Sequence, residues 1–168
     1  MSKKRLSQTK KNIVFLGHMG SGKSTIGRGL SKKLGLDFYD TDKEIEKEMG
    51  QKIAKIFDES GESIFRNIER KITLKLLDKK NSIIALGGGG FEDLKIRKLV
   101  LNKCNSIWLK CDLNILEKRC RVSKKRPLLS NKNIKAEFER LNKIRQKNYS
   151  KAKFTIDVSK KNKYQIIK

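Results

Sequence analysis

The 168-residue sequence contains one proline, one histidine and three cysteines, and it has few acidic residues. The cysteines, Cys104, Cys111 and Cys120, form no CxxC pair, so we expect reduced thiols rather than a disulfide framework. A zinc site is not expected, because the one histidine, His18, lies far from them in the sequence. No apolar run approaches the roughly 18–20 residues of a membrane span, and the first residues lack the apolar segment of a secretory signal. We therefore predict a cytoplasmic protein without a membrane partner.

The chain carries 42 Lys+Arg against 18 Asp+Glu, which gives a formal net charge of +24. Such an excess is typical of proteins that bind nucleic acids. However, most of the basic residues are lysines and alanine is scarce, a bias that an A/T-rich coding sequence would also produce. The charge by itself therefore does not identify a ligand.

The distribution of apolar residues predicts one folded domain at 12–168, preceded by a basic head at 1–11 that we expect to be disordered. Strand and helix patterns alternate, which favours a parallel sheet with helices on both faces. Strands are predicted at 12–16, 37–40, 81–86, 106–109 and 154–157. Helices are predicted at 24–34, 41–49, 61–79 and 133–149, with a further helix after Asp112.

The strongest motif is a glycine-rich loop at 17–24 with the sequence Gly-His-Met-Gly-Ser-Gly-Lys-Ser. It follows an apolar strand and precedes a helix, the context in which the pattern GxxxxGK[ST] binds a nucleoside triphosphate. Its glycines let successive backbone N–H groups face phosphate oxygens, and the helix N-terminus adds a favourable dipole. Lys23 is expected to reach the β- and γ-phosphates, and Ser24 to ligate Mg²⁺. A small-molecule kinase, a GTPase and a motor fragment all remain possible.

Acidic residues lie at the carboxyl end of the second predicted strand, the edge at which parallel α/β sheets bind ligands. Asp40 and Asp42 flank Thr41, which together with Glu44 has the form of a capping box. With Thr41 as N-cap, Asp42 is the first helical residue, and the helix dipole favours its ionised form. Either both acids only cap the helix, or Asp42 orients a substrate hydroxyl and accepts its proton.

Two arginines fit either a surface role or a site role. Arg66 lies on the helix predicted at 61–79, roughly opposite an isoleucine stripe that begins at Ile64, and it has glutamates at i−4 and i+3. Arg145 continues the apolar stripe of the helix at 133–149. A guanidinium directed toward the protein needs an anionic partner, which a bound carboxylate would provide. Alternatively, Arg66 forms only an exposed ion pair and Arg145 reaches past the stripe to solvent.

The order of motifs along the chain resembles that of shikimate kinases, from Asn12 to the C-terminal region. The phosphate loop is common to many kinases, whereas the full ordered set is far more selective. The matching motifs are Gly-Ser-Gly-Lys-Ser-Thr-Ile-Gly at 20–27, Phe-Tyr-Asp-Thr-Asp at 38–42, Ile-Phe-Arg-Asn-Ile-Glu at 64–69, Gly-Gly-Gly at 87–89, Lys-Lys-Arg-Pro-Leu-Leu at 124–129, and Arg145 with Tyr149. The resemblance implies a three-layer α/β P-loop kinase fold, with a five-stranded parallel sheet flanked by helices and a mobile lid at about 122–132.

The resemblance also implies an activity, transfer of the ATP γ-phosphoryl group to the 3-hydroxyl of shikimate, with Mg²⁺, in chorismate and aromatic amino acid biosynthesis. The implied catalytic residues are Lys23, Asp42 and Arg126. The implied nucleotide contacts are Gly20, Ser21, Gly22, Lys23, Ser24, Thr25, Arg119 and Arg126. The implied shikimate contacts are Asp42, Arg66, Gly88 and Arg145, and the implied metal ligands are Ser24 and Asp40. We expect a monomer without a specific nucleic-acid partner.

Arginine is scarce beside lysine in this chain, so the positions of its ten arginines are informative. Four of them, Arg66, Arg119, Arg126 and Arg145, fall on the implied site, and only a guanidinium offers the planar fork that binds carboxylate or phosphate bidentately. Three rivals remain: a kinase for another hydroxylated acid such as gluconate or for a nucleotide, a nucleic-acid-binding P-loop protein, and an inactive relative that binds a partner.

Overall fold

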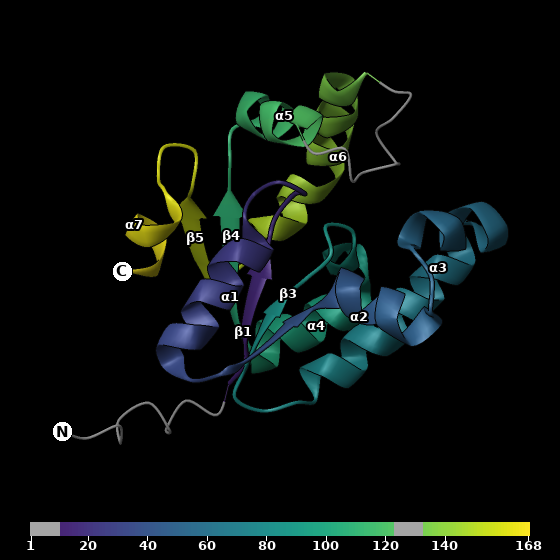
Figure 1. Ribbon diagram of the computed structural model, residues 1–168, viewed down its shortest axis with the longest axis horizontal. Helices are drawn as coiled ribbons and strands as arrows, with labels where there is room; N and C mark the ends of the chain where they lie inside the picture. Colours follow the sequence, from purple (N-terminus) through teal and green to yellow (C-terminus); the bar gives the residue numbers. More distant parts are fainter. Residues whose placement is uncertain (1–10, 123–132) are drawn as a thin grey trace.

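A parallel sheet of five strands forms the middle of the computed structural model, which describes residues 11–122 and 133–168 (Figure 1). The strands are β1 Ile13–Leu16, β2 Asp37–Asp40, β3 Ser82–Ala85, β4 Asn105–Lys110 and β5 Phe154–Asp157. Their order across the sheet is β2-β3-β1-β4-β5, and every neighbouring pair is parallel. The predicted five-stranded parallel sheet is therefore confirmed. The head, apart from its last residue, and nearly all of the implied lid lie outside the described residues.

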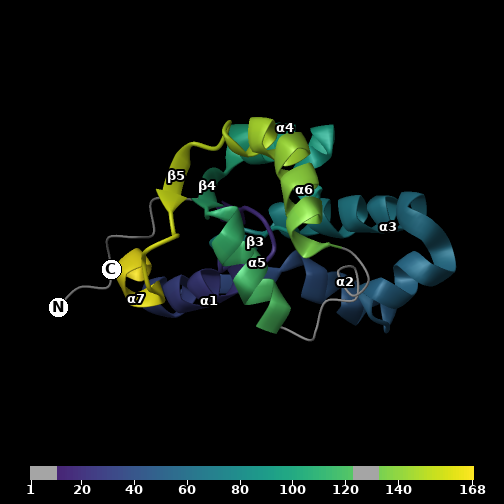
Figure 2. The same cartoon turned by 90° about the horizontal axis from the view of Figure 1, so that it is seen from above.

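Helices cover both faces of the sheet, which completes the three predicted layers (Figure 2). They are α1 Lys23–Leu34, α2 Thr41–Met49, α3 Ile53–Leu77, α4 Leu94–Lys103, α5 Leu113–Val122, α6 Ile134–Tyr149 and α7 Lys163–Ile167, with a 3₁₀ turn η1 at Gly90–Glu92. Helices α1 and α7 pack on one face, and α3 and α4 pack on the other. In the described part of the chain, no helix has the length and apolar character to cross a membrane.

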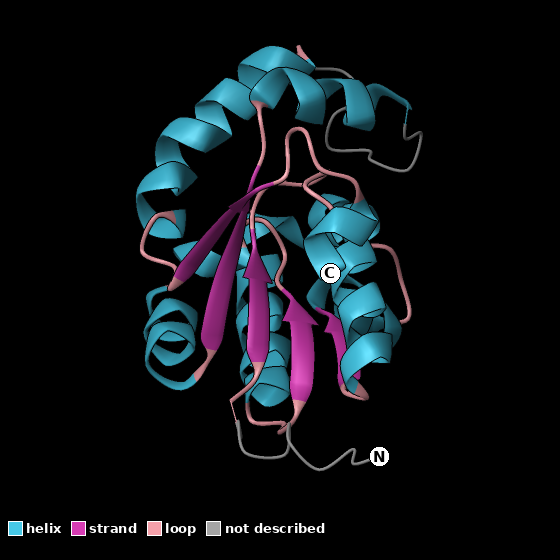
Figure 3. Cartoon of the chain, turned by 90° about the vertical axis from the view of Figure 1, so that its left-hand side faces the viewer, coloured by secondary structure: helices cyan, strands magenta, loops and turns pink. Residues whose placement is uncertain are grey.

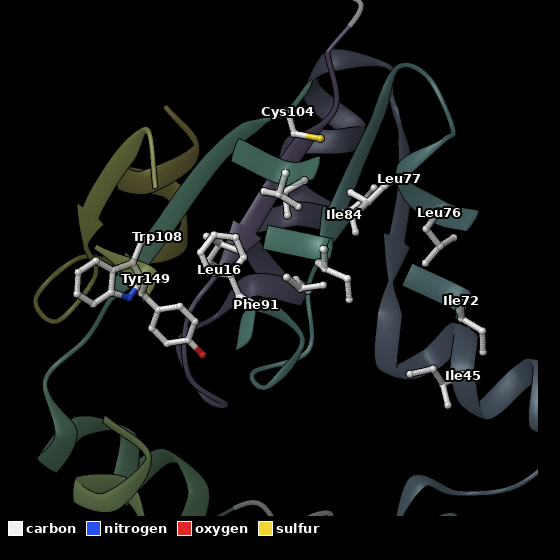
Figure 4. Packing of buried hydrophobic residues seen from close by; sticks show 14 of the residues in the cluster. Leu16, Ile45, Ile72, Leu76, Leu77, Ile84, Phe91, Cys104, Trp108 and Tyr149 are labelled. Atoms are coloured by element: carbon white, nitrogen blue, oxygen red, sulfur yellow. The ribbon is translucent and has the colours of Figure 1, made fainter. Parts of the chain in front are cut away.

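The central strands are buried on both faces, because their successive side chains point into two different cores. On β1, Val14 and Leu16 pack with α3 and α4, whereas Phe15 packs with α1. Figure 4 shows part of the first core, where Tyr149 from α6 lies near Trp108 from β4. Trp108, in the middle of β4, is buried.

Helix α3 differs from its prediction in both length and buried face. It begins at Ile53 rather than near Gly61, and Gly61 interrupts it with a positive φ of 77°, a conformation that glycine adopts without a Cβ clash. The buried face passes through Phe65 and Ile72, while Ile64 is 51% exposed. The predicted isoleucine stripe is therefore wrong by one position at its start.

Two helices form where the sequence analysis predicted none. Helix α4 begins after Asp93, whose side chain accepts hydrogen bonds from the backbone N–H groups of Lys95 and Ile96. Helix α7 begins after Asn162, which forms a capping box with Gln165. Each of these side chains is an N-cap of a preferred type, so the sequence did contain a signal for both helix starts.

The strand arrowheads point toward one edge of the sheet (Figure 3). The loops after β1 and β3 and the start of α2 after β2 meet at this edge, because their strands are neighbours in the sheet. The phosphate loop, the acidic pair Asp40 and Asp42, and the glycine run at 87–89 therefore come together, as expected for a ligand site in an open α/β sheet.

Candidate active site

The phosphate loop has the strand, loop and helix context that its sequence predicted. Gly20 and Gly22 adopt positive φ angles of 81° and 97°, which let the chain turn tightly between β1 and α1. Helix α1 begins at Lys23, whose Nζ donates to the carbonyl oxygens of Gly17 at 2.8 Å and His18 at 2.9 Å. The ammonium group is thus held over the loop that it is expected to serve.

Asp40 connects the phosphate loop to helix α2. Its carboxylate accepts a short hydrogen bond from the Ser24 hydroxyl and also caps α2, accepting from the backbone N–H of Lys43 at 3.4 Å. The expectation that Thr41 is the N-cap is therefore wrong. Thr41 is the first helical residue and Asp42 is the second. The Thr41 hydroxyl instead accepts from the backbone N–H of Gly87 at 2.7 Å, because aspartate caps equally well and leaves Thr41 to anchor the glycine run.

The three glycines at 87–89 lie against the three side chains implied to bind shikimate. A Cβ at Gly87 would lie 2.5 Å from Oδ1 of Asp42, and one at Gly88 would lie 3.0 Å from Nη1 of Arg145. A Cβ at Gly89 would lie 2.5 Å from Nη1 of Arg66. A side chain at any of these positions would press on the functional group of Asp42, Arg145 or Arg66 and displace it. The structure thus brings Asp42, Arg66, Gly88 and Arg145 to one place.

Asp42 has a raised pKa although the residue as a whole is exposed. Protein atoms around its carboxyl group desolvate the charged form, and this raises its pKa to about 6. The neighbouring carboxylates of Asp40 and Glu69 also raise the pKa, whereas Lys23 lowers it. A carboxyl group of this kind is ionised near neutral pH and is poised to accept a proton.

Arg66 is held by acidic residues on its own helix. Its Nη1 donates to Glu69 at 2.7 Å, and its Nη2 donates to Glu62 at 3.1 Å. The Glu69 side chain is 5% exposed, so it fixes one side of the guanidinium from within the protein. The pair is therefore partly buried rather than the fully exposed ion pair that the sequence left possible.

Arg145 is buried on α6, as its place in the apolar stripe predicted. In the described residues it forms no ion pair with a carboxylate, and the residues outside them, 1–10 and 123–132, contain no Asp or Glu. Tyr149, one turn later, donates its hydroxyl to the Gly88 carbonyl at 2.5 Å. Burial raises the pKa of this tyrosine, so it remains a donor. An anionic ligand beside this guanidinium would offset the cost of burying its charge.

The remaining implied nucleotide contacts divide into described and undescribed residues. Arg119 on α5 donates from Nη1 to the Gly20 carbonyl at 3.1 Å, which places it over the phosphate loop. Arg126 lies outside the described residues. A cavity of about 630 Å³ opens beside Ser24 and Thr25, and α7 supplies Lys163 and Tyr164 to its lining.

The sequence did not reveal the roles of Thr41 and Asn142 near the site, and no chemistry was assigned to His18. This histidine is 5% exposed, and its Nε2 lies 3.2 Å from Oδ1 of Asn142 on α6. Asn142 and the anchoring hydroxyl of Thr41 were the omissions. Both act across elements far apart in the sequence, so no local pattern could have revealed them.

The parallel sheet, the phosphate loop and the acidic residue beside two arginines define a P-loop kinase for a small molecule that carries a hydroxyl and a carboxylate. A model of the shikimate kinase family matches residues 19–168. The chain belongs to this family. It is an ATP-dependent enzyme that transfers the γ-phosphoryl group to the 3-hydroxyl of shikimate, a step of the shikimate pathway.

Relatives and solved structures agree with this assignment. The chain is 43% identical over 160 residues to the shikimate kinase of Persephonella marina, covering 94% of both chains. It is 42% identical over 142 residues to that of Zymomonas mobilis, covering 84% of this chain and 81% of the relative. Its structure is similar to that of shikimate kinase from Acinetobacter baumannii in complex with shikimate, with a TM-score of 0.90, 32% identity and coverage of 95% and 89%. A gluconokinase from Sinorhizobium meliloti has a TM-score of 0.56 at 14% identity, which shows a shared fold alone.

Proposed function

We propose that the residues around the glycine run divide the reaction between them. The observation that supports this division most directly is the close packing of three successive glycines against Asp42, Arg145 and Arg66. A ligand in contact with the backbone of this run meets one carboxylate and two guanidinium groups. Shikimate offers hydroxyl groups to the first and a carboxylate to the other two.

Asp42 acts as the general base. Its carboxylate accepts a hydrogen bond from the 3-hydroxyl and takes the proton as that oxygen attacks the γ-phosphorus of ATP. The bond between the γ-phosphorus and the bridging oxygen then breaks, and ADP leaves with the electron pair. Lys23 and Arg126 neutralise charge on the moving phosphoryl group.

Arg66 and Arg145 bind the shikimate carboxylate from two helices, and the backbone of Gly88 contacts the ring substituents. Glu69 sets the orientation of Arg66 through their 2.7 Å hydrogen bond. Because Arg145 is buried, the bound carboxylate supplies the counter-charge that its guanidinium otherwise lacks. The two arginines therefore select an anionic acceptor.

The phosphates of ATP lie along 20–25, where Gly20, Ser21, Gly22, Lys23, Ser24 and Thr25 offer backbone and side-chain donors. Arg119 lies above them, and the nucleoside extends toward the cavity beside Thr25. The family uses ATP, for which Mg²⁺ is the usual partner. The contact between the Ser24 hydroxyl and the Asp40 carboxylate fits this ion, which binds through one or two protein oxygens together with phosphates. Bound there, Mg²⁺ would neutralise phosphate charge.

We further propose that the enzyme works as a cytoplasmic monomer without a specific nucleic-acid partner. The proposed site is formed within one chain, and its cations are accounted for by two anionic substrates. The remaining excess of lysine predicts weak binding to RNA that disappears as salt is raised.

Replacing Arg66 by lysine is expected to weaken shikimate binding by about 1.5–3 kcal/mol, the worth of a hydrogen bond to a charged group. Lysine keeps the charge but loses the planar fork that binds a carboxylate and Glu69 together. Isothermal titration with shikimate and, separately, with ADP measures both affinities. Binding of ADP should be nearly unchanged. An unchanged affinity for shikimate would remove Arg66 from the carboxylate site.

The pH profile of kcat/KM for shikimate is expected to rise through a pKa of about 6 as Asp42 loses its proton. Below this pH the carboxyl group is protonated and cannot accept the proton of the hydroxyl. An initial-rate series from pH 5 to 8 at saturating ATP measures the profile. A flat profile over this range would contradict the proposed base.

The choice of acceptor is tested by ADP release with shikimate, quinate, gluconate and nucleoside monophosphates. We expect turnover with shikimate and much slower turnover with the nucleotides, because these carry phosphate rather than a carboxylate. The quinate rate shows whether a close analogue is accepted. Equal rates across the panel would exclude the carboxylate as the selected group.

A further inference from the structure

His18 connects two parts of the site that act on different substrates. It belongs to the phosphate loop, and its backbone carbonyl accepts from Lys23 Nζ at 2.9 Å. Its side chain points the other way, toward α6, where Nε2 lies 3.2 Å from Oδ1 of Asn142. Asn142 lies one turn before Arg145 on the same helix. One residue thus contacts both the loop assigned to ATP and the helix assigned to shikimate.

The chemistry of this link is that of a neutral imidazole. Burial lowers the pKa of His18 to about 4; the Asn142 contact opposes this shift, and the charges of Arg145 and Lys23 reinforce it. With one ring proton, Nε2 donates to the Asn142 amide oxygen, and the amide nitrogen of Asn142 in turn donates to Gln146 at 3.2 Å. The hydrogen bond therefore has a single direction over the working pH range.

Aromatic packing continues the link to the glycine run. The His18 ring meets Tyr149 edge-on, with 5.3 Å between ring centroids. Tyr149 holds the Gly88 carbonyl at 2.5 Å, and a Cβ at Gly88 would lie 3.8 Å from the Gly17 carbonyl oxygen. The phosphate loop and the glycine run are therefore neighbours, and His18 and Tyr149 fill the space behind them.

We propose that His18 is a positioning residue that, through its hydrogen bond to Asn142 and its contact with Tyr149, holds the phosphate loop in register with helix α6. The geometry of transfer depends on this register, because Lys23 lies on one side of the link and Arg145 on the other. A misplacement of the acceptor relative to the γ-phosphate lowers the rate of transfer even when each substrate still binds. The proposal rests on the assigned roles of Lys23 and Arg145.

Kinetics of His18→Phe, Asn142→Ala and the double variant test the link. Phenylalanine keeps the ring packing but cannot donate, so kcat should fall about 3- to 10-fold, the worth of one neutral hydrogen bond. Asn142→Ala should have the same effect, and the double variant should be no slower than either, because both remove one interaction. The dissociation constants of ADP and shikimate, each measured alone, should change less than about twofold.

Two further variants separate positioning from general stability. His18→Gln keeps a donor for Asn142 and should recover more than half of the kcat lost in His18→Phe. Glu139→Ala, at an exposed position on the same helix, should leave kcat unchanged. A lowered melting temperature with unchanged kcat in both His18→Phe and Asn142→Ala would overturn the proposal. If His18→Phe fails to fold, Asn142→Ala alone decides the kinetic test.

Because His18 is the only histidine in the chain, its ring gives a single set of ¹⁵N resonances in a protein that carries no added histidines. Shikimate without nucleotide should shift these resonances. Its carboxylate binds Arg145, which lies on the same helix as Asn142, the hydrogen-bond partner of His18. Asn142→Ala should reduce that shift. If the His18 resonances do not shift in a protein that titration shows to bind shikimate, the proposed role of His18 is contradicted. Loss of shikimate binding itself would instead contradict the proposed carboxylate site.

Discussion

Replacing Asp42 by asparagine is expected to lower kcat by a factor of about 10²–10⁴, the usual contribution of a positioned base. Asparagine keeps the size and the hydrogen-bonding capacity of the side chain but cannot accept the proton of the 3-hydroxyl. The KM for shikimate should change far less than kcat, because Arg66 and Arg145 still bind the carboxylate. Coupled detection of ADP release at saturating ATP measures both constants.

The matched control is Asp37→Asn, at an exposed aspartate that begins β2, the strand before helix α2 and Asp42. It should retain full activity, which shows that loss of one negative charge near β2 is not enough to impair catalysis. Near-normal turnover of Asp42→Asn would remove Asp42 from the role of base. A large rise in KM with unchanged kcat would assign it to binding alone.

The substitution Asp42→Asn is also expected to stabilise the fold at pH 7. The folded-state pKa of Asp42, about 6, lies above its ordinary value of 3.8. The folded protein therefore holds this proton more tightly than the unfolded chain, and the stabilisation is lost as the pH rises from about 4 through 6. The change Asp42→Asn removes that loss, because the amide does not ionise. Urea unfolding at pH 4 and pH 7 should show an advantage of the variant at pH 7 only.

Replacing Arg145 by methionine is expected to raise the KM for shikimate by roughly 30- to 5,000-fold, the range for truncating one partner of a buried charge pair. The bound carboxylate would lose the guanidinium that neutralises it inside the protein. Binding of ADP alone should stay nearly the same, because Arg145 lies on α6 rather than in the phosphate loop. Steady-state kinetics and titration with ADP measure the two effects.

The free energy of unfolding of Arg145→Met should be equal to or higher than that of the parent protein, although its affinity for shikimate is lower. In the described residues no carboxylate pairs with the buried guanidinium, and an apolar side chain removes its desolvation cost. Arg140→Met is the control, because Arg140 is an exposed residue of the same helix that pairs with Glu137. It should leave the KM for shikimate unchanged. A strongly destabilised Arg145→Met with a normal KM would make Arg145 a structural residue.

Asp42 and Arg145 share one physical feature, since the fold holds the charge of each at a cost, and each has a proposed role in substrate binding or catalysis. The raised pKa of Asp42 and the missing carboxylate partner of Arg145 are the two signs of this cost. In the proposed mechanism, substrate binding relieves the cost at Arg145, because the shikimate carboxylate comes to its guanidinium. Both variants should therefore show lower activity together with equal or higher stability, which is typical of functional sites.

Much of the architecture could be predicted from local patterns in the sequence. The phosphate loop was recognisable because its glycines, lysine and serine must occur at fixed spacing between a buried strand and a helix. The three inner strands, β1, β3 and β4, were recognisable because buried parallel strands are short apolar runs. The errors were local, as at Thr41, where a threonine and an aspartate compete for the same cap. Another error was the start of α3, because Gly61 resembles a helix boundary but is only a kink within the helix.

The sequence by itself determined which chemical groups the chain possesses, the order in which they occur, and the family to which that order belongs. Only the tertiary structure decided which of them meet. Asp42, Arg66, Gly88 and Arg145 are far apart along the chain, and their approach depends on the parallel register of β2, β3 and β1 and on the packing of α6. The place of His18 was decided in the same way. A histidine in a variable position of a loop has no local meaning, and it gains one only because burial against Tyr149 and Asn142 fixes its ring between two halves of the site.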